Sequence, residues 1–357
     1  MARIRTVSLS LAAVAAALSA SPLLADSSMI AGLDVLRTWN LVVLGDLTSS
    51  SEVEGRTFVA GDLNGNSSNY QIQSLPASST GTPGLTVVGD VNGGAKNLNN
   101  GSGAVVGGSV NSGLNLNGAA QTVLVGGSIS NTNVNNNTVT SGLASSDPSF
   151  SQNLTQQASL IQTSMTGLSH DMSTETANSQ LTISGNRGTF DAQPDANGVA
   201  VFTISAADLD KIGEIQFNLN GADTAIVNVS GGSITLNDNF LGGTQNLGEH
   251  VIWNFYEATD LSLTTAWGGS VLAPTAAATT GNYIQGSAVF GSLVQNGEMH
   301  VGTYTGTSYD PGSTPPTTPI EGGSSSGGTQ VPEPGMLGLL AAGVGGLLFW
   351  RRRRAAA

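Results

Sequence analysis

Short aliphatic runs that end in glycine recur along the first 130 residues. Each run is followed by Gly, then by Asp or Ser, and then by one more aliphatic residue. The last glycines of five such segments are Gly45, Gly61, Gly89, Gly108 and Gly127, which lie 16, 28, 19 and 19 residues apart. This recurrence is too short for a globular domain but suits one coil of a β-solenoid, so the pattern predicts stacked coils.

Glycine and asparagine suit the corners of such coils. Glycine supplies positive φ or close backbone approach, and asparagine tolerates the left-handed region. Residues 92–137 hold 12 asparagines, which can also form ladders between stacked coils. A disordered Gly/Asn linker is disfavoured because the aliphatic residues return in phase with the glycines.

A helix is expected to interrupt the repeat. Asp147 as N-cap and Pro148 at the first helical position begin it, and Gly167 lies near its expected end. Its single apolar stripe predicts packing against the side of the coils. The stripe consists of Leu154, Ile161, Met165 and Leu168.

Strand-like runs resume after this helix, and the glycine motif returns. Gly232 and Gly269 lie 37 residues apart, about two coils of the earlier length. One interrupted solenoid is therefore more economical than two domains. The expected fold is mainly β: a single-stranded right-handed β-helix (β-solenoid) with one α-helix packed alongside.

The N-terminus has the order of a Sec-type signal peptide. Basic residues extend to Arg5, an apolar run covers 7–18, and small residues precede Asp26. The run is too short to span a membrane comfortably. We therefore expect export, with residues 1–25 removed by cleavage after Ala25.

The C-terminus combines a short motif, an apolar segment at 335–350 and an arginine cluster. As a transmembrane helix, the segment is about 24 Å long, a little short of the roughly 30 Å hydrocarbon core, but it can insert. The arginines hold that end in the cytoplasm by the positive-inside rule, which leaves everything upstream outside. The flanking residues are Val331, Pro332, Glu333 and Pro334 on one side and Arg351, Arg352, Arg353 and Arg354 on the other.

This tail resembles the PEP-CTERM sorting signal of Gram-negative bacteria over residues 330–354. An ordinary tail anchor would explain the helix and the arginines but not the Pro-Glu-Pro motif. The resemblance implies processing near this motif by an exosortase, a membrane-embedded cysteine-type enzyme. It also implies a membrane-tethered precursor that reaches the cell surface or the extracellular space. Residues 311–330 almost lack apolar side chains and predict a flexible linker, which leaves 26–310 as the folded domain.

The body of the chain resembles the choice-of-anchor A domain, a family of exported bacterial adhesin domains. The resemblance covers about residues 30–305, implies a β-helix with a helix on its side, and supplies no catalytic residues. Residues 269–274 are also similar to a segment of bacterial ice-binding β-helices. The pairs Thr264–Thr265 and Thr279–Thr280 look isolated, because threonine does not recur at coil spacing. The similar segments are 40–47, 54–63, 228–234, 251–261, 268–276 and 284–300.

Composition narrows the possible functions. The 357 residues include no cysteine, which excludes a disulfide framework and a cysteine zinc site. The formal net charge is −13, the wrong sign for a nucleic-acid partner. We expect no cofactor.

Candidate catalytic and metal-binding residues lack a convincing pattern. His170, His250 and His300 show no spaced ligand motif, and neither calcium-loop pattern is present, so no metal site is assigned. No Gly-x-Ser-x-Gly elbow supports a triad hydrolase. Three acidic pairs are candidates for glycoside cleavage: Asp46 with Asp62, Glu52 with Glu54, and Asp208 with Asp210.

The aspartates that follow the motif glycines are expected to form turns. Asp46, Asp62 and Asp90 occupy the corner position that Ser109 and Ser128 take in later coils. Acid/base chemistry needs the carboxyl group itself, so a position that accepts serine indicates structure.

The sequence therefore predicts a non-enzymatic, exported, surface- or matrix-associated adhesin. Its expected partners are the processing exosortase, the membrane through the C-terminal helix, and exopolysaccharide in a biofilm or another cell-surface ligand. One alternative is a carbohydrate-active β-helix enzyme, a glycosidase or lyase, which converging carboxylates would favour. Ice binding, which a flat threonine face would favour, is the other.

Overall fold

A computed structural model describes residues 29–307 and residue 309. The predicted signal peptide with its cleavage site after Ala25, the linker at 311–330 and the whole sorting signal at 331–354, with its apolar segment, lie outside these residues. In the part of the chain that is described, no helix is long and apolar enough to cross a membrane.

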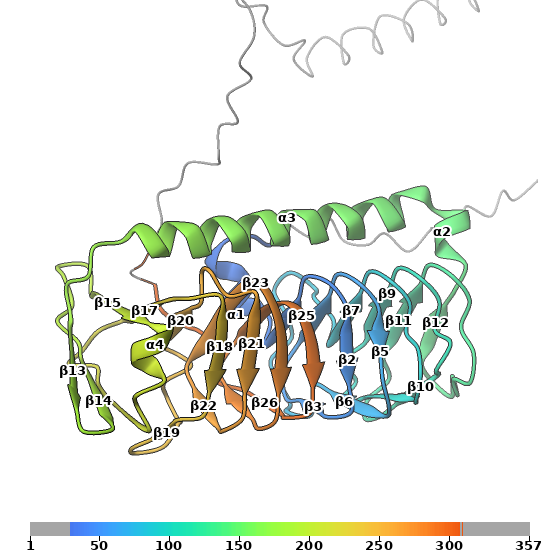
Figure 1. Ribbon diagram of the computed structural model, residues 1–357. Helices are drawn as coiled ribbons and strands as arrows, with labels where there is room; N and C mark the ends of the chain where they lie inside the picture. Colours follow the sequence, from blue (N-terminus) through green and yellow to red (C-terminus); the bar gives the residue numbers. More distant parts are fainter. Residues whose placement is uncertain (1–28, 308, 310–357) are drawn as a thin grey trace, which may run out of the picture. The chain divides into compact units, whose positions relative to one another are not determined.

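The described chain is mainly β and forms a stack of parallel strands with three faces (Figure 1). The first half supplies β1 (Leu41–Val43), β2 (Leu47–Ser49), β3 (Glu52–Val53), β4 (Thr57–Val59), β5 (Leu63–Asn64), β6 (Ser68–Tyr70), β7 (Leu85–Val87), β8 (Lys96–Leu98), β9 (Ala104–Val106), β10 (Leu114–Leu116), β11 (Thr122–Val125) and β12 (Thr138–Thr140). The second half supplies β13 (Gln180–Ser184), β14 (Arg187–Asp191), β15 (Val199–Ser205), β16 (Glu214–Asn218), β17 (Thr224–Ser230), β18 (Ser233–Leu236), β19 (Asn239–Phe240), β20 (Val251–Asn254), β21 (Asp260–Leu263), β22 (Trp267–Gly268), β23 (Ser270–Thr280), β24 (Ile284–Gln285), β25 (Ala288–Gln295) and β26 (Met299–His300). The described helices are α1 (Leu33–Thr38), α2 (Leu143–Ser146), α3 (Pro148–Thr174) and α4 (Ala206–Leu209).

The three faces are defined by strand pairing. The first face carries β12, β11, β9, β7, β4, β1, β25, β23, β20, β17 and β15 in this spatial order. The second face consists of β18, β21, the C-terminal halves of β23 and β25, β2 and β5. The third face consists of β22, β24, β26, β3, β6, β8 and β10. A separate four-stranded sheet contains β13, β14, β16 and β19, and its β13–β14 pair is antiparallel.

The coils do not stack in chain order. The first coil, which begins with β1, lies in the middle of the stack and pairs with the last coil, which contains β25. The chain winds from the middle to the end at β12, returns along α3, and winds from the end at β15 back to the middle (Figure 1). The sequence predicted one solenoid interrupted by a helix but not this order.

We call the junction between β1–β3 and β25–β26 the seam. Parallel pairing across it aligns Val42 with Val289 on the first face, Thr48 with Val294 on the second, and Val53 with Met299 on the third. The seam is therefore continuous on all three faces, and it closes the stack without leaving a free strand edge in the middle.

Buried side chains at the seam add hydrogen bonds. Asn40, 1% exposed, donates through Nδ2 to the carbonyl oxygens of Gly286 at 2.7 Å and His300 at 3.0 Å. Its Oδ1 accepts a hydrogen bond from the Gly55 N–H at 3.0 Å. On the second face, Ser49 Oγ donates to Gln295 Oε1 at 2.8 Å. These polar groups are buried only because each has a partner across or beside the seam.

Corner side chains connect neighbouring coils elsewhere. Asp46 Oδ1 accepts a hydrogen bond from the Asp62 N–H at 2.8 Å, and Asp62 Oδ1 accepts one from the Asp90 N–H at 2.7 Å. In the next coils, Asp90 Oδ1 accepts a hydrogen bond from the Ser109 N–H, and Ser109 Oγ accepts one from the Ser128 N–H. Each aspartate or serine is thus a structural acceptor at the corner.

This ladder explains why glycine precedes each corner acceptor. A Cβ on Gly61 would lie 2.2 Å from Asp46 Oδ1, and one on Gly89 would lie 2.2 Å from Asp62 Oδ1. Only glycine leaves room for the acceptor side chain of the adjacent coil. Close approach, rather than positive φ, selects glycine at these two positions.

Helix α3 covers the first face, as its apolar stripe predicted. Asp147 Oδ1 accepts a hydrogen bond from the Ser149 N–H, which confirms the N-cap. Ile161, Met165 and Met172 are fully buried against first-face side chains such as Ile226. The helix extends to Thr174, so Gly167 is inside the helix and does not mark its end.

Replacement of the corner glycine in Gly89→Ala should lower the melting temperature by several degrees, because its Cβ would overlap both Asp62 Oδ1 and the Gly61 backbone. Thermal unfolding followed by circular dichroism measures this change. The matched control is Gly167→Ala in α3, where a Cβ meets nothing within 4 Å. That variant should be as stable as the parent or slightly more stable, since alanine favours helix.

Asp238 predicts a pH-dependent loss of stability. Its side chain is 1% exposed and its Oδ1 has no hydrogen-bond partner among the described residues. Burial, with a smaller contribution from the negative charge of Asp210, raises the pKa of Asp238 from 3.8 to about 7. The folded state therefore favours the protonated carboxyl, so the free energy of unfolding should fall as the pH rises from about 4 to about 7.

Asp238→Asn should remove this effect because asparagine cannot ionise. We expect the melting temperature of the variant to exceed that of the parent by several degrees at pH 8 and to match it closely at pH 4. Asp171→Asn, at an exposed carboxylate on α3, is the control and should show no such difference. Equal melting temperatures of parent and Asp238→Asn at pH 8 would contradict the assignment.

Candidate functional site

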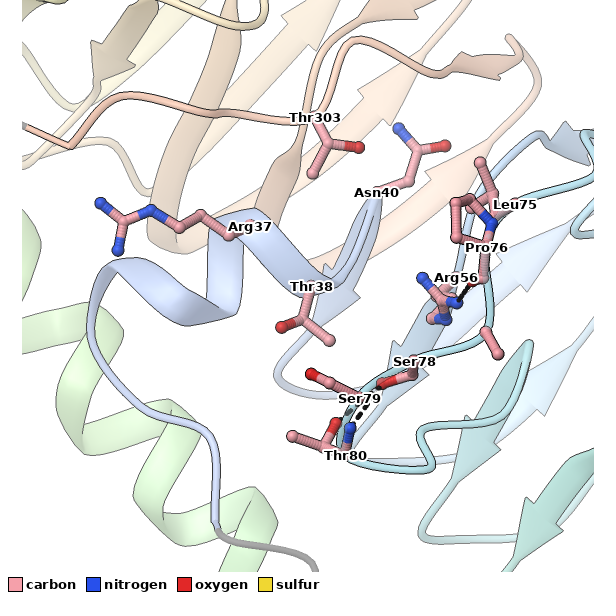
Figure 2. Close-up of a pocket in the computed structure, with 11 residues that line it drawn as sticks. Arg37, Thr38, Asn40, Arg56, Leu75, Pro76, Ser78, Ser79, Thr80 and Thr303 are labelled. Carbon is pink, nitrogen blue, oxygen red and sulfur yellow. Dashed lines mark hydrogen bonds between the residues drawn. The ribbon is translucent and has the colours of Figure 1, made fainter.

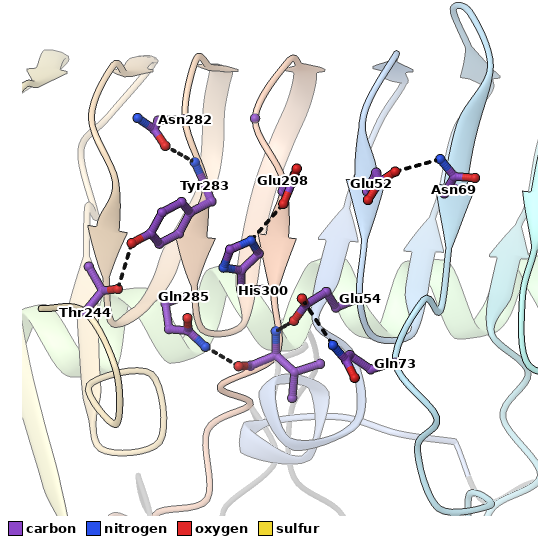
Figure 3. Close-up of polar contacts among 12 residues, drawn as sticks. Glu52, Glu54, Asn69, Gln73, Thr244, Asn282, Tyr283, Gln285, Glu298 and His300 are labelled. Carbon is purple, nitrogen blue, oxygen red and sulfur yellow. Dashed lines mark hydrogen bonds and ion pairs between the residues drawn. The ribbon is translucent and has the colours of Figure 1, made fainter.

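The third face presents a polar cluster at the seam (Figure 3). The inward residues Ile284, Met299, Val53 and Tyr70 of β24, β26, β3 and β6 are buried, whereas the residues that alternate with them point outward. We call the outward set at the seam the seam cluster. Its members are Tyr283, Gln285, Glu298, His300, Glu52 and Glu54.

An aromatic pair forms the flat part of the seam cluster. The rings of Tyr283 and His300 are stacked, with centroids 4.3 Å apart and an angle of 11° between their planes. Glu298 Oε2 lies 2.8 Å from His300 Nε2, and this contact is an ion pair when His300 is protonated. Both rings are half-buried, so part of each ring remains exposed on the third face.

The carboxylates of the cluster are held by neighbouring coils. Glu54 Oε2 accepts a hydrogen bond from the Val301 N–H at 2.7 Å, which ties the first coil to the last. Gln73 Nε2 donates to Glu54 Oε1 at 3.4 Å, and Asn69 Nδ2 donates to Glu52 Oε1 at 3.0 Å. Gln285 Nε2 donates to the Val301 carbonyl oxygen. These bonds fix carboxylate and amide groups on an open surface, where they can bind hydroxyl groups of a ligand.

The second face carries a row of small polar side chains. Their alignment follows from the strand register, in which Thr279 lies opposite both Ser262 and Val294. Val294 is 46% exposed and interrupts the hydroxyl groups. In spatial order the row is Thr235, Ser262, Thr279, Val294, Thr48 and Asn64.

This row corrects one expectation from the sequence. Thr279 is not part of an isolated pair, because stacking out of chain order aligns it with Thr48 and Thr235. Thr280 is buried, and Thr264 and Thr265 donate to the backbone carbonyls of Leu236 and Asp238. The spacing of threonines along the sequence could not reveal the row, since its members come from both halves of the chain.

The structure does not bring the three histidines together. His170 is exposed on α3, and His250 Nδ1 lies 2.9 Å from the carbonyl oxygen of Asp223. Over residues 29–307 and 309, no group of three histidine, aspartate or glutamate side chains could hold a metal ion.

The acidic pairs have separate environments. Asp46 and Asp62 belong to the corner ladder described above. Asp208 lies 2.8 Å from Lys211 Nζ, and hydrogen bonds from Lys211 and Ser205 lower the pKa of its carboxyl. Glu52 and Glu54 alone join a candidate site, the seam cluster.

Sequence reasoning missed Tyr283 and Gln285. The available signal was the alternation of polar residues with Ile284 and Met299, which is typical of a half-buried strand. The sequence could not reveal that these positions lie beside Glu52 and Glu54, because the first and last coils were not expected to pair.

A comparison with protein-family models matches residues 32–301 to the family described as Putative Ice-binding-like adhesive domain. The chain belongs to this family. The family name supports the adhesin-like character predicted from the sequence, whereas the finer assignment to the choice-of-anchor A domain stays a prediction. No curated protein and no solved structure matches the chain.

A second family model, the PEP-CTERM protein-sorting motif, matches residues 330–354. This match indicates export to the surface of a Gram-negative bacterium and processing by an exosortase. The adhesive domain and the sorting motif together identify an exported surface protein whose adhesive part is the solenoid described here.

Proposed function

We propose that this protein is a non-enzymatic adhesin that binds a hydroxyl-rich extracellular polysaccharide through the seam cluster, within a biofilm or on the cell surface. The observation that carries the proposal is the stacked Tyr283–His300 pair beside fixed carboxylates and amides on an uncovered face. Aromatic rings offer an apolar surface to the C–H side of a sugar ring, and carboxylate and amide groups accept or donate hydrogen bonds to its hydroxyls.

The proposal includes a division of the chain into domains. Residues 1–25 serve export, 26–310 form the adhesive solenoid, 311–330 are a linker, and 331–354 are the sorting signal with a transmembrane helix in the precursor. A linker between solenoid and anchor would let the third face reach ligands beyond the membrane. Exosortase cleavage near Val331 would then release the solenoid or transfer it to another surface component.

An enzymatic role has weaker support. Glu52 and Glu54 are half-buried and Glu298 is exposed, and all three carboxylates are hydrogen-bonded on the third face. Glycoside cleavage uses two carboxyl groups on either side of a bound sugar, one of them protonated at working pH. The seam cluster can bind a polysaccharide on its surface, but it does not place two carboxyl groups on either side of a sugar.

Ice binding is a second candidate function, through another face. The hydroxyl row on the second face favours it, because Thr235, Ser262, Thr279 and Thr48 lie at the regular spacing of neighbouring strands. Val294 is a break in that row. Inhibition of ice recrystallisation by the protein, and its loss in Thr279→Lys, would support this function independently of the seam cluster.

Tyr283→Ala should weaken binding to the producer's own exopolysaccharide by about tenfold or more, because it removes the apolar plate and leaves His300 without its stacking partner. Sedimentation of the protein with the polysaccharide measures this effect. Tyr256→Ala, at a half-buried tyrosine between β20 and β21 of the first and second faces, is the matched control and should bind like the parent.

Unchanged binding by a folded Tyr283→Ala variant would contradict the assignment of the seam cluster. Turnover of the polysaccharide by the parent protein would instead favour the glycosidase or lyase.

A further inference from the structure

An insertion in one coil builds a pocket beside the seam. Gly61 and Gly89 lie 28 residues apart rather than 19, and the additional residues fall between β6 and β7. There the chain passes beside α1 and encloses a pocket of about 300 Å³ (Figure 2). Thr303, near the described C-terminal end, completes the lining. The pocket therefore depends on the inserted segment and on both partners of the seam.

Arg56 brings an uncompensated positive charge to this pocket. Its Nη2 donates to the carbonyl oxygen of Pro76, while its buried Nε has no hydrogen-bond partner in the described part of the chain. No carboxylate among the described residues forms an ion pair with it. Desolvation lowers the pKa of Arg56, so the guanidinium gains from any anion that reaches it.

Three other cations of the described solenoid contrast with Arg56, whereas Lys96, which also lacks a carboxylate partner, donates to the carbonyl oxygens of Gly65 and Asn66. Arg37, also at the pocket, lies 2.9 Å from Asp34 and donates to the Gly306 carbonyl. Arg187 and Lys211 each pair with a carboxylate, at 2.9 and 2.8 Å. In a chain with a net charge of −13, an arginine facing a pocket without acidic lining is a distinct feature.

Hydroxyl groups line the pocket near Arg56 (Figure 2). Ser78 Oγ and Thr80 Oγ1 lie 2.8 Å apart, and Thr80 Oγ1 and Thr82 Oγ1 are also 2.8 Å apart. Thr38 and Thr303 add two further hydroxyls to the lining. The pocket thus combines one cation with several groups that can donate or accept hydrogen bonds.

We propose that this pocket binds the carboxylate of an acidic sugar unit, a hexuronate, with Arg56 as its charge partner. A planar guanidinium matches a planar carboxylate, and a single unpaired arginine suits a single negative charge. The serine and threonine hydroxyls serve the hydroxyl groups of the same sugar. The volume is at the lower end of ligand pockets and suits one sugar unit.

The pocket continues from the seam cluster. A single residue separates Glu54 from Arg56, and a single residue separates Val301 from Thr303, so both chain segments lead from the third face into the pocket. A polysaccharide with neutral and acidic units can therefore lie on the third face with a carboxylate at Arg56. The binding of such an extended polysaccharide rests on the proposed function of the seam cluster. The binding of a single uronate in the pocket does not depend on that function.

The test is isothermal titration calorimetry of the full chain. One titration uses a trigalacturonate, and the other uses the neutral galactose trimer of the same linkage. We expect binding of the acidic trimer only, and a loss of at least about tenfold in Arg56→Gln. Arg187→Gln, which removes an ion-paired arginine elsewhere, is the matched control and should bind like the parent. Equal affinity for both trimers, or full binding by Arg56→Gln, would overturn the proposal.

Further arms separate the possible outcomes. Thr38→Val keeps Arg56 and should weaken the acidic trimer by a smaller factor, so the proposal can be judged even where Arg56→Gln does not fold. Inorganic phosphate that displaces the trimer at equal concentration would overturn recognition of a uronate. Tyr283→Ala should leave trimer binding unchanged while it weakens polysaccharide binding, so failure of the pocket and failure of the seam cluster are distinguishable.

Discussion

The parallel pairing of the first coil with the last is the constraint on which the remaining structure depends. It involves all three faces and is supported by buried polar contacts such as Ser49 with Gln295, 246 positions apart in the chain. Since both coils are buried on their inner sides, separation would expose two stacks of aliphatic side chains and two rows of unpaired backbone groups. The seam therefore joins the two half-solenoids, each formed by one half of the chain, into one continuous solenoid.

This arrangement requires a connection between the two far ends, and α3 supplies it. Its 27 residues span about 40 Å as a helix, which is enough to cross many strands at roughly 4.8 Å each. Its buried stripe covers the first face, so the second and third faces are the ones left for ligands. Both the seam cluster and the Arg56 pocket then combine residues from the two halves of the chain.

Local features could be predicted from the sequence, because local chemistry determines them. The corner glycines follow from the room that Asp46 and Asp62 need, and Asp147 with Pro148 begins α3 as expected. The order of the coils could not be predicted. All coils have similar short aliphatic strands, so the sequence does not distinguish which coils pair with each other. The hydroxyl row and the seam cluster were missed for this reason. The irregular spacing between Gly61 and Gly89, by contrast, was a visible sign of the pocket.

The most direct test of the account is disulfide trapping across the seam. The chain has no cysteine, so each introduced pair reports on one contact. Thr48 and Val294 are register partners on the exposed second face, within reach of a disulfide. The account predicts that Thr48→Cys with Val294→Cys forms an intrachain disulfide under mild oxidation, detected by mass spectrometry. Thr140→Cys with Thr203→Cys joins coils that chain order would make neighbours but that lie at opposite ends here, and should stay reduced. The reverse result would contradict the account.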